Sequence, residues 1–520
     1  MKLVEIRDLD GPNLFMLEPA IKVEIQLEDG EAQSEIARRL DSDYSDLRAA
    51  AESFLARAGH ASVVVSRRMD SPGHISIAFS WRSRAKALDV AGQMAAAMLS
   101  VVDDNIPGCI TELTVSGGVA DMPECLPDSQ RSAIAIAVTG TNGKTTTTRL
   151  TAHLMQSAGY RTGWNSSSGI YIDGEEIEAG DYSGPSGARR ILDDPSVQAA
   201  VLETARGGIL LRGLGYAHND VSVFTNVSAD HLGLQGVLTL ETMAEVKAVV
   251  CKVTRPGGVA VVNADDPLVM AATNAIAAPR TLVTQRPDNL LVMEHMTAGG
   301  TTIIADEREI VVRRGETVAA RFILDEIPMT YAGRARHMVE NAMCAIGAAL
   351  GGGLGSAQIR SGLRTFRNDA AGNLGRMNIY RSNDVTFVLD FAHNEAGITH
   401  LVDFGRRLLD GDGRLISIIG TAGDRTEASL KAIGRIAAEA SDIVIAHGTV
   451  KYLRGRTLDE LLGLYRSGVE LHPETEYHES ETELTGLEDA ITLARPGDVI
   501  VMMAHEFLPQ LTSRLKEIAD

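Results

Sequence analysis

The chain has 520 residues, too many for a single hydrophobic core, and at about 100–200 residues per domain we expect about three domains. Its formal charge of −20 argues against nucleic acid or an anionic membrane as a partner, because both require a dominant basic surface. The four cysteines are scattered without a Cys-x-x-Cys pair, which argues against a disulfide framework or a zinc site. The charged amino terminus and the glycine-interrupted apolar run 341–359 indicate neither a signal peptide nor a bilayer span, so we expect a cytoplasmic protein.

Residues 1–118 are predicted to form a small α+β domain. Apolar and polar side chains alternate, as is typical of half-buried strands, in three segments: 20–27, 60–66 and 74–79. Two further segments are expected to be helices: 41–58 and 85–102. Residues 119–130 contain several turn formers and show no periodicity, which predicts a linker.

Residues 133–147 combine an apolar strand, a tight turn and the start of a helix. Amides of the turn and of the first helical turn would point at an anion, and Lys144 would add a full positive charge. The hydroxyl of Thr145 could join the coordination shell of Mg²⁺. This segment predicts binding of a nucleoside triphosphate, although Val138 replaces the first glycine of the general Walker pattern; the alternative, a purely structural turn, does not need Lys144. The candidate phosphate-binding residues are Thr141, Asn142, Gly143, Lys144, Thr145 and Thr146.

From 131 to 366 strands alternate with helices, which predicts a doubly wound, mostly parallel sheet with an antiparallel insertion at 281–330. Polar residues follow the ends of several predicted strands in this region. The carboxyl ends of parallel strands meet at one edge, so these side chains are expected to share a crevice, with ordinary solvated surface as the alternative for each one alone. The residues expected there are Lys144, Glu203, His231 and Asp265.

Residues 367–520 contain a second strand–helix series and are predicted to form a Rossmann-like α/β domain. Its predicted strands are 385–389, 415–419, 442–446 and 498–502. Charged or polar loops follow these strands, which predicts a second ligand-binding edge. His505 and Glu506 follow the last strand, and the sequence gives them no role.

The segment Val138-Thr-Gly-Thr-Asn-Gly-Lys-Thr-Thr146 resembles the phosphate loop of the Mur ligase superfamily, ATP-dependent enzymes that join a carboxylate to an amino acid amine. Four further motifs follow in the family's order: Asp230-His231-Leu, His337-x-x-x-Asn341, Gly375-Arg376 and Asp390-Phe-Ala-His393-Asn394. Within the superfamily the chain is especially similar to the ligase half of the cyanophycin synthetases, in segments such as 202–210, 263–267, 362–366 and 453–456. Its opening, 6–14, is similar as well. Those enzymes carry an ATP-grasp domain where this chain has only the linker near 117–130.

The resemblance implies that the chain uses ATP and Mg²⁺. It implies that Lys144 contacts the β- and γ-phosphates, and that Thr145 and Glu203 bind a first Mg²⁺. It also implies a second Mg²⁺ held by His231 and by Lys247 as a carbamate. The alternative for His231 is a hydrogen-bonded histidine at a strand end without a metal. The alternative for Lys247 is an exposed lysine on a helix. The residues expected to reach ATP from elsewhere are Asn341, which would contact adenine, and Arg376, Asp390 and His393, which would close onto it from the last domain.

By the same resemblance, loops of the last domain would bind the incoming amino acid, with surface solvation as the alternative. The residues concerned are Asp424, Arg425, Lys451, Arg454 and Arg456. The similar amino-terminal segment implies that residues 1–118 bind the acceptor, whereas Arg7 and the turn Gly11-Pro-Asn13 have a simpler structural explanation.

Together these features predict an ATP- and Mg²⁺-dependent ligase that activates a carboxylate as an acyl phosphate and couples it to an amine. The expected acceptor is a small molecule or short acidic peptide resembling an aspartyl side chain, and the expected amine is a basic amino acid. The sequence leaves open a Mur-type ligase of peptidoglycan, folate-like or poly-γ-glutamate chemistry. It also leaves open a kinase and a nucleotide-dependent regulatory protein without ligase activity. No nucleic acid or membrane partner is expected, and homo-oligomerisation is left open.

Overall fold

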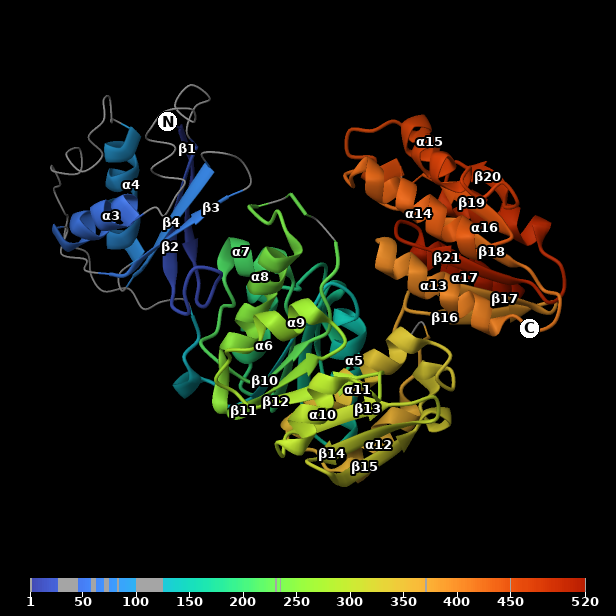
Figure 1. The fold of residues 1–520 in the computed structure, drawn as a ribbon, viewed down its shortest axis with the longest axis horizontal. Coiled ribbons are helices and arrows are strands. Elements are labelled where there is room, and N and C mark those ends of the chain that lie inside the picture. Colours follow the sequence, from blue (N-terminus) through green and yellow to red (C-terminus); the bar gives the residue numbers. More distant parts are fainter. Residues whose placement is uncertain are drawn as a thin grey trace.

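The computed structural model describes residues 2–26, 45–57, 62–69, 74–81, 84–99, 125–229, 232–233, 235–369, 372–448 and 450–519. These residues form three sheets that follow one another along the chain, which confirms the predicted fold class (Figure 1). The sheets appear in the order of the predicted domains, whose boundaries stay a prediction. In the described part of the chain, every helix is too short or too polar to cross a bilayer.

The first sheet is antiparallel, in the order β1-β2-β4-β3. Its strands are β1 (Lys2–Leu9), β2 (Ala20–Gln26), β3 (Val64–Arg68) and β4 (His74–Ser80), and helices α3 (Ser45–Arg57) and α4 (Arg84–Leu99) pack on it. Alternation in β2 and β4 sends Val23 and Ile77, which are register partners, into one core with Phe54. The sequence analysis did not identify β1 as a strand, because its charged residues obscure the alternation.

The second sheet is the largest, with eleven strands in the order β15-β14-β13-β12-β11-β10-β5-β9-β6-β7-β8. Its parallel centre comprises β5 (Ile134–Thr139), β6 (Thr162–Ser166), β9 (Ala199–Glu203), β10 (Asn219–Phe224), β11 (Thr254–Asn263), β12 (Arg280–Thr284) and β13 (Thr301–Ala305). Antiparallel strands extend both edges: β7 (Gly169–Ile172), β8 (Glu175–Ala179), β14 (Glu309–Arg314) and β15 (Thr317–Ile323). The predicted insertion is therefore part of this sheet, since β13 pairs parallel to β12 and antiparallel to β14.

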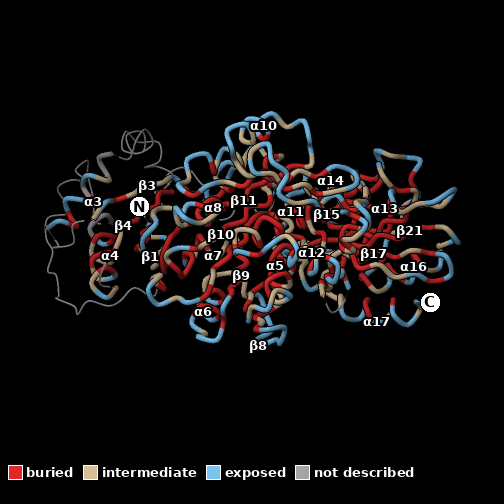
Figure 2. Tube along the Cα trace, turned by 90° about the horizontal axis from the view of Figure 1, so that it is seen from below, coloured by how far each residue is buried: buried red, intermediate tan, exposed pale blue. Residues whose placement is uncertain are grey.

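Helices cover both faces of this sheet, because its central strands are apolar on both sides. In β5, Ile136 and Val138 join the core beneath one helical layer, while Ala135 and Ala137 join the other. The first layer contains α5 (Lys144–Ser157), α11 (Arg336–Gly351) and α12 (Ser356–Thr365). The second contains α6 (Pro185–Leu192), α7 (Arg206–Arg212), α8 (Leu240–Lys252), α9 (Pro267–Ala272) and α10 (Leu290–Thr297). Figure 2 shows the central strands β9 and β10 largely buried, whereas the edge strand β8 is exposed.

The third sheet has the order β16-β17-β21-β18-β19-β20 and is parallel except for β16. Its strands are β16 (Asn378–Ser382), β17 (Val385–Asp390), β18 (Leu415–Ile419), β19 (Ile443–His447), β20 (Glu476–Ser480) and β21 (Val499–Met503). The helices α13 (Glu395–Leu408), α14 (Glu427–Ala440) and α15 (Leu458–Val469) share one core, and α16 (Glu483–Leu493) and α17 (Leu508–Ile518) lie over the other face.

Glu483 joins the first turn of α16 to the turn that follows β21. It is fully buried, and its carboxylate accepts hydrogen bonds from the backbone N–H groups of His505 (2.8 Å), Glu506 (3.0 Å) and Phe507 (2.9 Å). Burial opposes ionisation, but the hydrogen bond with His505, the charge of His447 and the N–H of Phe507 together lower the pKa of Glu483 from 4.5 to about 2.

We expect Glu483→Gln to lower the free energy of unfolding at pH 7 by on the order of 3 kcal/mol. The folded-state pKa is depressed, so this contribution is complete above the unfolded value of 4.5 and is lost as the pH falls toward 2. Urea unfolding at pH 7 and pH 3 should show the gap between wild type and variant shrink by more than half at pH 3. Glu481→Gln, at an exposed position just before α16, is the matched control. A gap of equal size at both pH values would contradict this explanation.

Candidate functional site

The turn after β5 has the shape of an anion cradle. Gly143 adopts a left-handed φ of 83° immediately before α5 begins at Lys144, and a Cβ on it would lie 2.2 Å from Oδ1 of Asn341. Asn226, which follows β10, holds the turn in place. The backbone N–H of Thr141 donates to the Asn226 carbonyl (2.8 Å), and the backbone N–H of Asn142 donates to Asn226 Oδ1 (2.9 Å). A side chain at position 143 would collide with Asn341, so only glycine fits between the turn and α11.

A cavity lies over this turn, between the second and third sheets. It brings together most of the residues that the sequence analysis proposed for nucleotide binding. Those that line it are Thr141, Asn142, Gly143, Lys144, Thr145, Thr146, Asn341, Arg376, Asp390 and His393. Two chain segments more than 200 residues apart thus line one cavity, as the family resemblance implied; Glu203 and Asp265, expected there from the strand ends, are not among its lining residues.

Glu203 lies at the carboxyl end of β9 and is 2% exposed. Its Oε1 accepts a hydrogen bond from Thr145 Oγ1 (3.1 Å), and its Oε2 is buried without a hydrogen-bond partner. Burial raises the pKa of Glu203, while the positive charges of Lys144 and Arg376 oppose that shift. An unsatisfied buried carboxylate oxygen beside a threonine hydroxyl and a phosphate cradle fits Mg²⁺, which binds through one or two protein oxygens and substrate phosphates. Among the described residues no three His, Cys, Asp or Glu side chains form a metal site by themselves.

Lys247 lies on α8, on the opposite side of the turn from Asn341. It is 4% exposed, and its Nζ donates to the Gly140 carbonyl at 2.7 Å. The alternative of an exposed helix lysine is therefore wrong. Carbamylation of Lys247 stays a prediction, and Asp230 and His231 lie outside the described residues.

The third sheet contributes its residues from the segment around β17. Asp390 Oδ2 accepts the backbone N–H of Met377 (2.9 Å), and the Arg376 guanidinium lies 4.9 Å from the centre of the Phe391 ring. Burial raises the pKa of Asp390, and the charge of Arg376 opposes it. His393 Nδ1 lies 3.1 Å from the Phe391 carbonyl.

Two asparagines join the domains directly at the cradle. Asn394 Nδ2 donates to Asn142 Oδ1 (3.2 Å), and Asn142 Nδ2 lies 3.4 Å from Asn394 Oδ1. In the connecting segment, Asn373 Nδ2 donates to Thr146 Oγ1 (3.3 Å). The phosphate turn thus contacts the last domain through Asn394, and α5 contacts the segment that leads to Arg376.

Sequence reasoning assigned no role to three further residues that line the cavity. His337 of α11 and His400 of α13 stack with ring centres 5.1 Å apart, and burial lowers the pKa of both rings, so both are neutral at pH 7. Glu340 accepts a hydrogen bond from Asn226 Nδ2 (3.2 Å), and burial raises its pKa to about 7. His337 belongs to one of the motifs quoted in the sequence analysis. Glu340 and His400 lie within helices, so the strand-end pattern used to predict site residues could not identify them.

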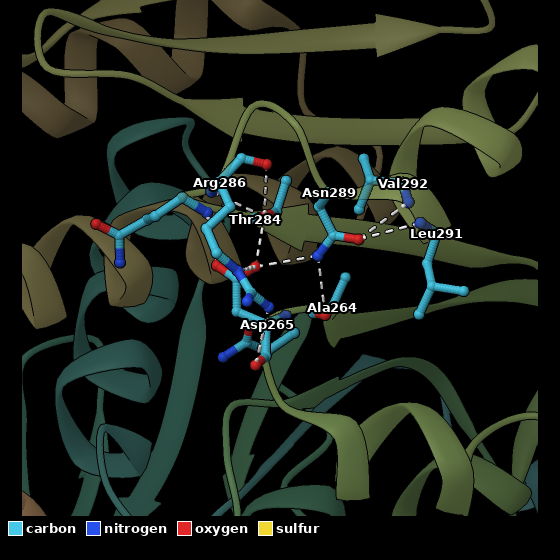
Figure 3. A network of polar contacts seen from close by, with 9 residues as sticks. Ala264, Asp265, Thr284, Arg286, Asn289, Leu291 and Val292 are labelled. Carbon is cyan, nitrogen blue, oxygen red and sulfur yellow. Dashed lines mark hydrogen bonds and ion pairs between the residues drawn. The ribbon is translucent and has the colours of Figure 1, made fainter.

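Asp265 departs from the prediction that it shares the crevice. Figure 3 shows its carboxylate turned toward the end of β12 and the loop that follows it, where Thr284, Arg286 and Asn289 lie. It accepts hydrogen bonds from Thr284 Oγ1 (2.5 Å), the Gln285 N–H (2.7 Å), Arg286 Nε (3.0 Å) and Asn289 Nδ2 (3.2 Å). It does not line the cavity, because these loop donors hold both of its oxygens.

The loops proposed for the incoming amino acid lie near one another in the last domain. Arg454 pairs with Asp424 (2.8 Å), Arg456 Nε donates to the Gly423 carbonyl (2.8 Å), and Arg425 Nε donates to Thr421 Oγ1 (3.2 Å). Lys451 Nζ lies 5.3 Å from the centre of the Tyr452 ring, and its backbone N–H donates to Glu506 (3.3 Å). Their role stays a prediction.

At the other end of the chain the turn at Gly11 is structural. Asn13 Oδ1 caps the N–H groups of Phe15 and Met16, and the Pro12 carbonyl accepts the N–H of Leu214 from the second sheet's loops (3.0 Å). Arg7 pairs with Glu5.

Comparison with known proteins places two family matches on this chain. Residues 138–349 match the Mur ligase middle domain, and residues 375–505 match the Mur ligase, glutamate ligase domain. The chain is 36% identical over 402 residues to cyanophycin synthetase of Trichormus variabilis and 38% identical over 391 residues to that of Synechocystis sp.. These alignments cover 77% and 75% of the chain, but only 44% of each relative, so the chain spans less than half the length of these relatives.

Two further comparisons are more distant. The UDP-N-acetylmuramoyl-L-alanyl-D-glutamate–2,6-diaminopimelate ligase of Corynebacterium efficiens is 27% identical over 391 residues, which cover 72% of the chain and 69% of the ligase. Among solved structures, FolC of E. coli with DHPP and ADP has a TM-score of 0.56 at 18% identity, covering 75% of this chain and 90% of FolC. At that identity the likeness shows a shared fold.

We expect Gly143→Ala to weaken binding of an unreactive ATP analogue about tenfold or more, because the added Cβ would collide with Asn341 and strain the turn. Isothermal titration with Mg²⁺ measures the affinity, and thermal unfolding checks the fold. Gly159→Ala is the matched control: its φ is also positive, at 95°, but nothing lies within 4 Å of the added atom. Equal nucleotide affinity of Gly143→Ala and wild type would show that the phosphates bind elsewhere.

Proposed function

Since the chain belongs to the Mur ligase family, we propose that it is an ATP-dependent ligase that joins a substrate carboxylate to an amine through an acyl phosphate. The observation that supports this most is the group at one sheet edge formed by Lys144, Thr145 and the buried Glu203, one of whose carboxylate oxygens has no hydrogen-bond partner. This group combines a phosphate cradle with a carboxylate suited to Mg²⁺.

In the proposed reaction a carboxylate oxygen attacks the γ-phosphorus of ATP, the bond to the β–γ bridging oxygen breaks, and ADP leaves. The amine then attacks the acyl carbon, loses a proton, and phosphate departs with the oxygen that had attacked. Lys144 would neutralise charge on the transferring group, and Thr145 and Glu203 would hold Mg²⁺, which supplies further charge neutralisation. Positioning and electrostatics then provide most of the catalysis.

Closure of the last domain would complete the site. Arg376, Asp390 and His393 line the cavity from that domain, and Asn142 and Asn394 meet across the boundary. A site divided between two domains allows substrates to enter while open and excludes water from the acyl phosphate when closed.

For the substrates, the proposal follows the cyanophycin synthetase relatives. The acceptor is an aspartyl-like acid or short acidic peptide, bound with help from residues 1–118. The amine is a basic amino acid, bound by the loops that contain Asp424 and Arg454. We place the reaction in the cytoplasm, where ATP is supplied. Because the chain spans less than half of those relatives, only one ligase centre is proposed.

The experiment that tests the function is phosphate release from ATP and Mg²⁺ with a panel of amines and acidic acceptors, followed by mass spectrometry of the products. A ligase requires both co-substrates and yields an amide. A product formed from a muramyl peptide, folate or poly-γ-glutamate acceptor would instead support the other Mur-type chemistries, and phosphate release without either co-substrate would indicate a nucleotide switch.

Lys144→Ala should reduce amine-dependent phosphate release by about 10³-fold or more, because the charge that stabilises the transferring phosphoryl group is removed. Steady-state phosphate assays with the full chain measure this effect. Lys431→Ala, which removes an exposed lysine of α14, should leave the rate unchanged. Turnover of Lys144→Ala at the wild-type rate would mean that the phosphate turn has been misassigned.

Lys247→Ala should also lose activity, and short carboxylates such as acetate should restore part of it if a carbamate on Lys247 is a metal ligand. The rate is measured over a series of acetate concentrations, with thermal unfolding as the check on folding. Lys252→Ala, at the exposed end of the same helix, is the control. A folded, inactive variant with no recovery at any acetate concentration would leave Lys247 as a structural donor to the Gly140 carbonyl.

A further inference from the structure

The turn that follows β21 contains His505, a side chain that the proposed function does not use. This turn lies beside the segment that follows β17, because the two strands are parallel neighbours and the backbone N–H of Ala504 donates to the Asp390 carbonyl (2.9 Å). Asp390 and His393 line the nucleotide cavity from that segment, whereas His505 does not line it. Any effect of His505 on a bound nucleotide must therefore pass through its neighbours.

The imidazole of His505 is held from two sides. Its side chain is 9% exposed, and Nε2 lies 2.7 Å from the Ala392 carbonyl. Because a carbonyl oxygen only accepts, Nε2 carries a proton and donates it to this bond. Nδ1 lies 3.6 Å from a carboxylate oxygen of Glu483, which also accepts the backbone N–H of His505 (2.8 Å). These contacts fix the ring relative to the turn.

Phe391 links His505 to Arg376. The rings of His505 and Phe391 have their centres 5.0 Å apart and 73° between their planes, an edge-to-face arrangement. The Arg376 guanidinium lies over the Phe391 ring, 4.9 Å from its centre, in a cation–π contact. The backbone N–H of Phe391 donates to the carbonyl of Gly375, the residue before Arg376 (2.7 Å). Phe391 therefore contacts this part of the chain through both its ring and its backbone.

A second contact joins the same turn to Gly375. Gly375 has a left-handed φ of 69°, and a Cβ on it would lie 2.8 Å from Cδ2 of Leu508, the first residue of α17. The chain before Arg376 thus packs on the segment that follows His505. Within the described ranges no ion pair holds the Arg376 guanidinium, so its direction depends on the Phe391 ring and on this backbone packing.

We propose that His505 is a positioning residue, which holds Phe391 in place and thereby directs the Arg376 guanidinium into the nucleotide cavity. The inference goes beyond the proposed function and rests on it only in taking this cavity as the ATP site. Arg376 lines that cavity, and its charge acts on Glu203. A guanidinium makes two hydrogen bonds to a phosphate only in the right orientation, so a support that fixes its direction strengthens nucleotide binding.

The test is a double-mutant cycle on nucleotide affinity, measured by titration calorimetry of the full chain with Mg²⁺ and an unreactive ATP analogue. Arg376→Ala should weaken binding about tenfold or more, because a charged hydrogen bond to phosphate is lost. His505→Ala should weaken binding about fivefold in the wild-type chain. In the Arg376→Ala chain the same substitution should change the affinity by less than about twofold, because the side chain that His505 positions is absent.

Two further variants test the contacts between His505 and Arg376. His505→Gln can still donate to the Ala392 carbonyl and should keep most of the wild-type affinity. Phe391→Leu lacks the aromatic face, so it should weaken binding as His505→Ala does, and this effect should also disappear in the Arg376→Ala chain. It tests the same contacts if thermal unfolding shows that His505→Ala does not fold. His478→Ala, which removes a histidine of the edge strand β20, should bind nucleotide as wild type does.

Equal weakening by His505→Ala with and without Arg376 would overturn the proposal, since that is the result of a purely structural role. Wild-type affinity of either single alanine variant would overturn it as well. Binding is measured without turnover, so the two proposals fail separately. If the cycle shows the expected coupling but the chain releases no amine-dependent phosphate, the positioning role holds and the ligase function fails. If phosphate release requires the amine but the two effects add, the ligase function holds and the positioning role fails.

Discussion

The hydrogen bond from Thr145 to Glu203 is the interaction on which the rest of the site depends. It joins the first turn of α5 to the end of β9 and leaves the other oxygen of Glu203 buried without a partner. An isolated carboxylate in such a position would be costly, and its raised pKa reflects that cost. The positive charges of Lys144, Arg376 and Arg149 offset part of that cost, and the proposed Mg²⁺ would offset more of it.

Three positively charged side chains act on the carboxylate of Glu203. Lys144 comes from the phosphate turn, Arg149 from the next turn of α5, and Arg376 from the segment that leads into the last domain, and all three favour its ionised form. Asp390 and Glu340 line the neighbouring cavity, so acidic and basic side chains alternate around the phosphate turn. The net charge of −20 is therefore no guide to the local field.

The sequence predicted those parts of the site that depend on local patterns of residues. The strand and turn at 133–147, the strand end at Glu203 and the second sheet's parallel core all follow from local patterns, and the structure has them. It misassigned Asp265, because a strand end places a side chain at the edge but does not show that Thr284 and Arg286 will capture it. It missed β1, whose charged residues obscure the alternation, and it missed the cavity-lining position of His400, which depends on packing between helices far apart in the chain. Such contacts leave no periodic signal.

The central claim is that ATP phosphorylates the acceptor carboxylate, in the site formed by Lys144 and Glu203, before the amine attacks. Isotope transfer tests it most directly, using an acceptor labelled with ¹⁸O in its carboxylates together with ATP, Mg²⁺ and the amine. The account predicts one ¹⁸O in each phosphate released with amide formation, because the attacking oxygen departs with the phosphoryl group. Amide formation with unlabelled phosphate would contradict it.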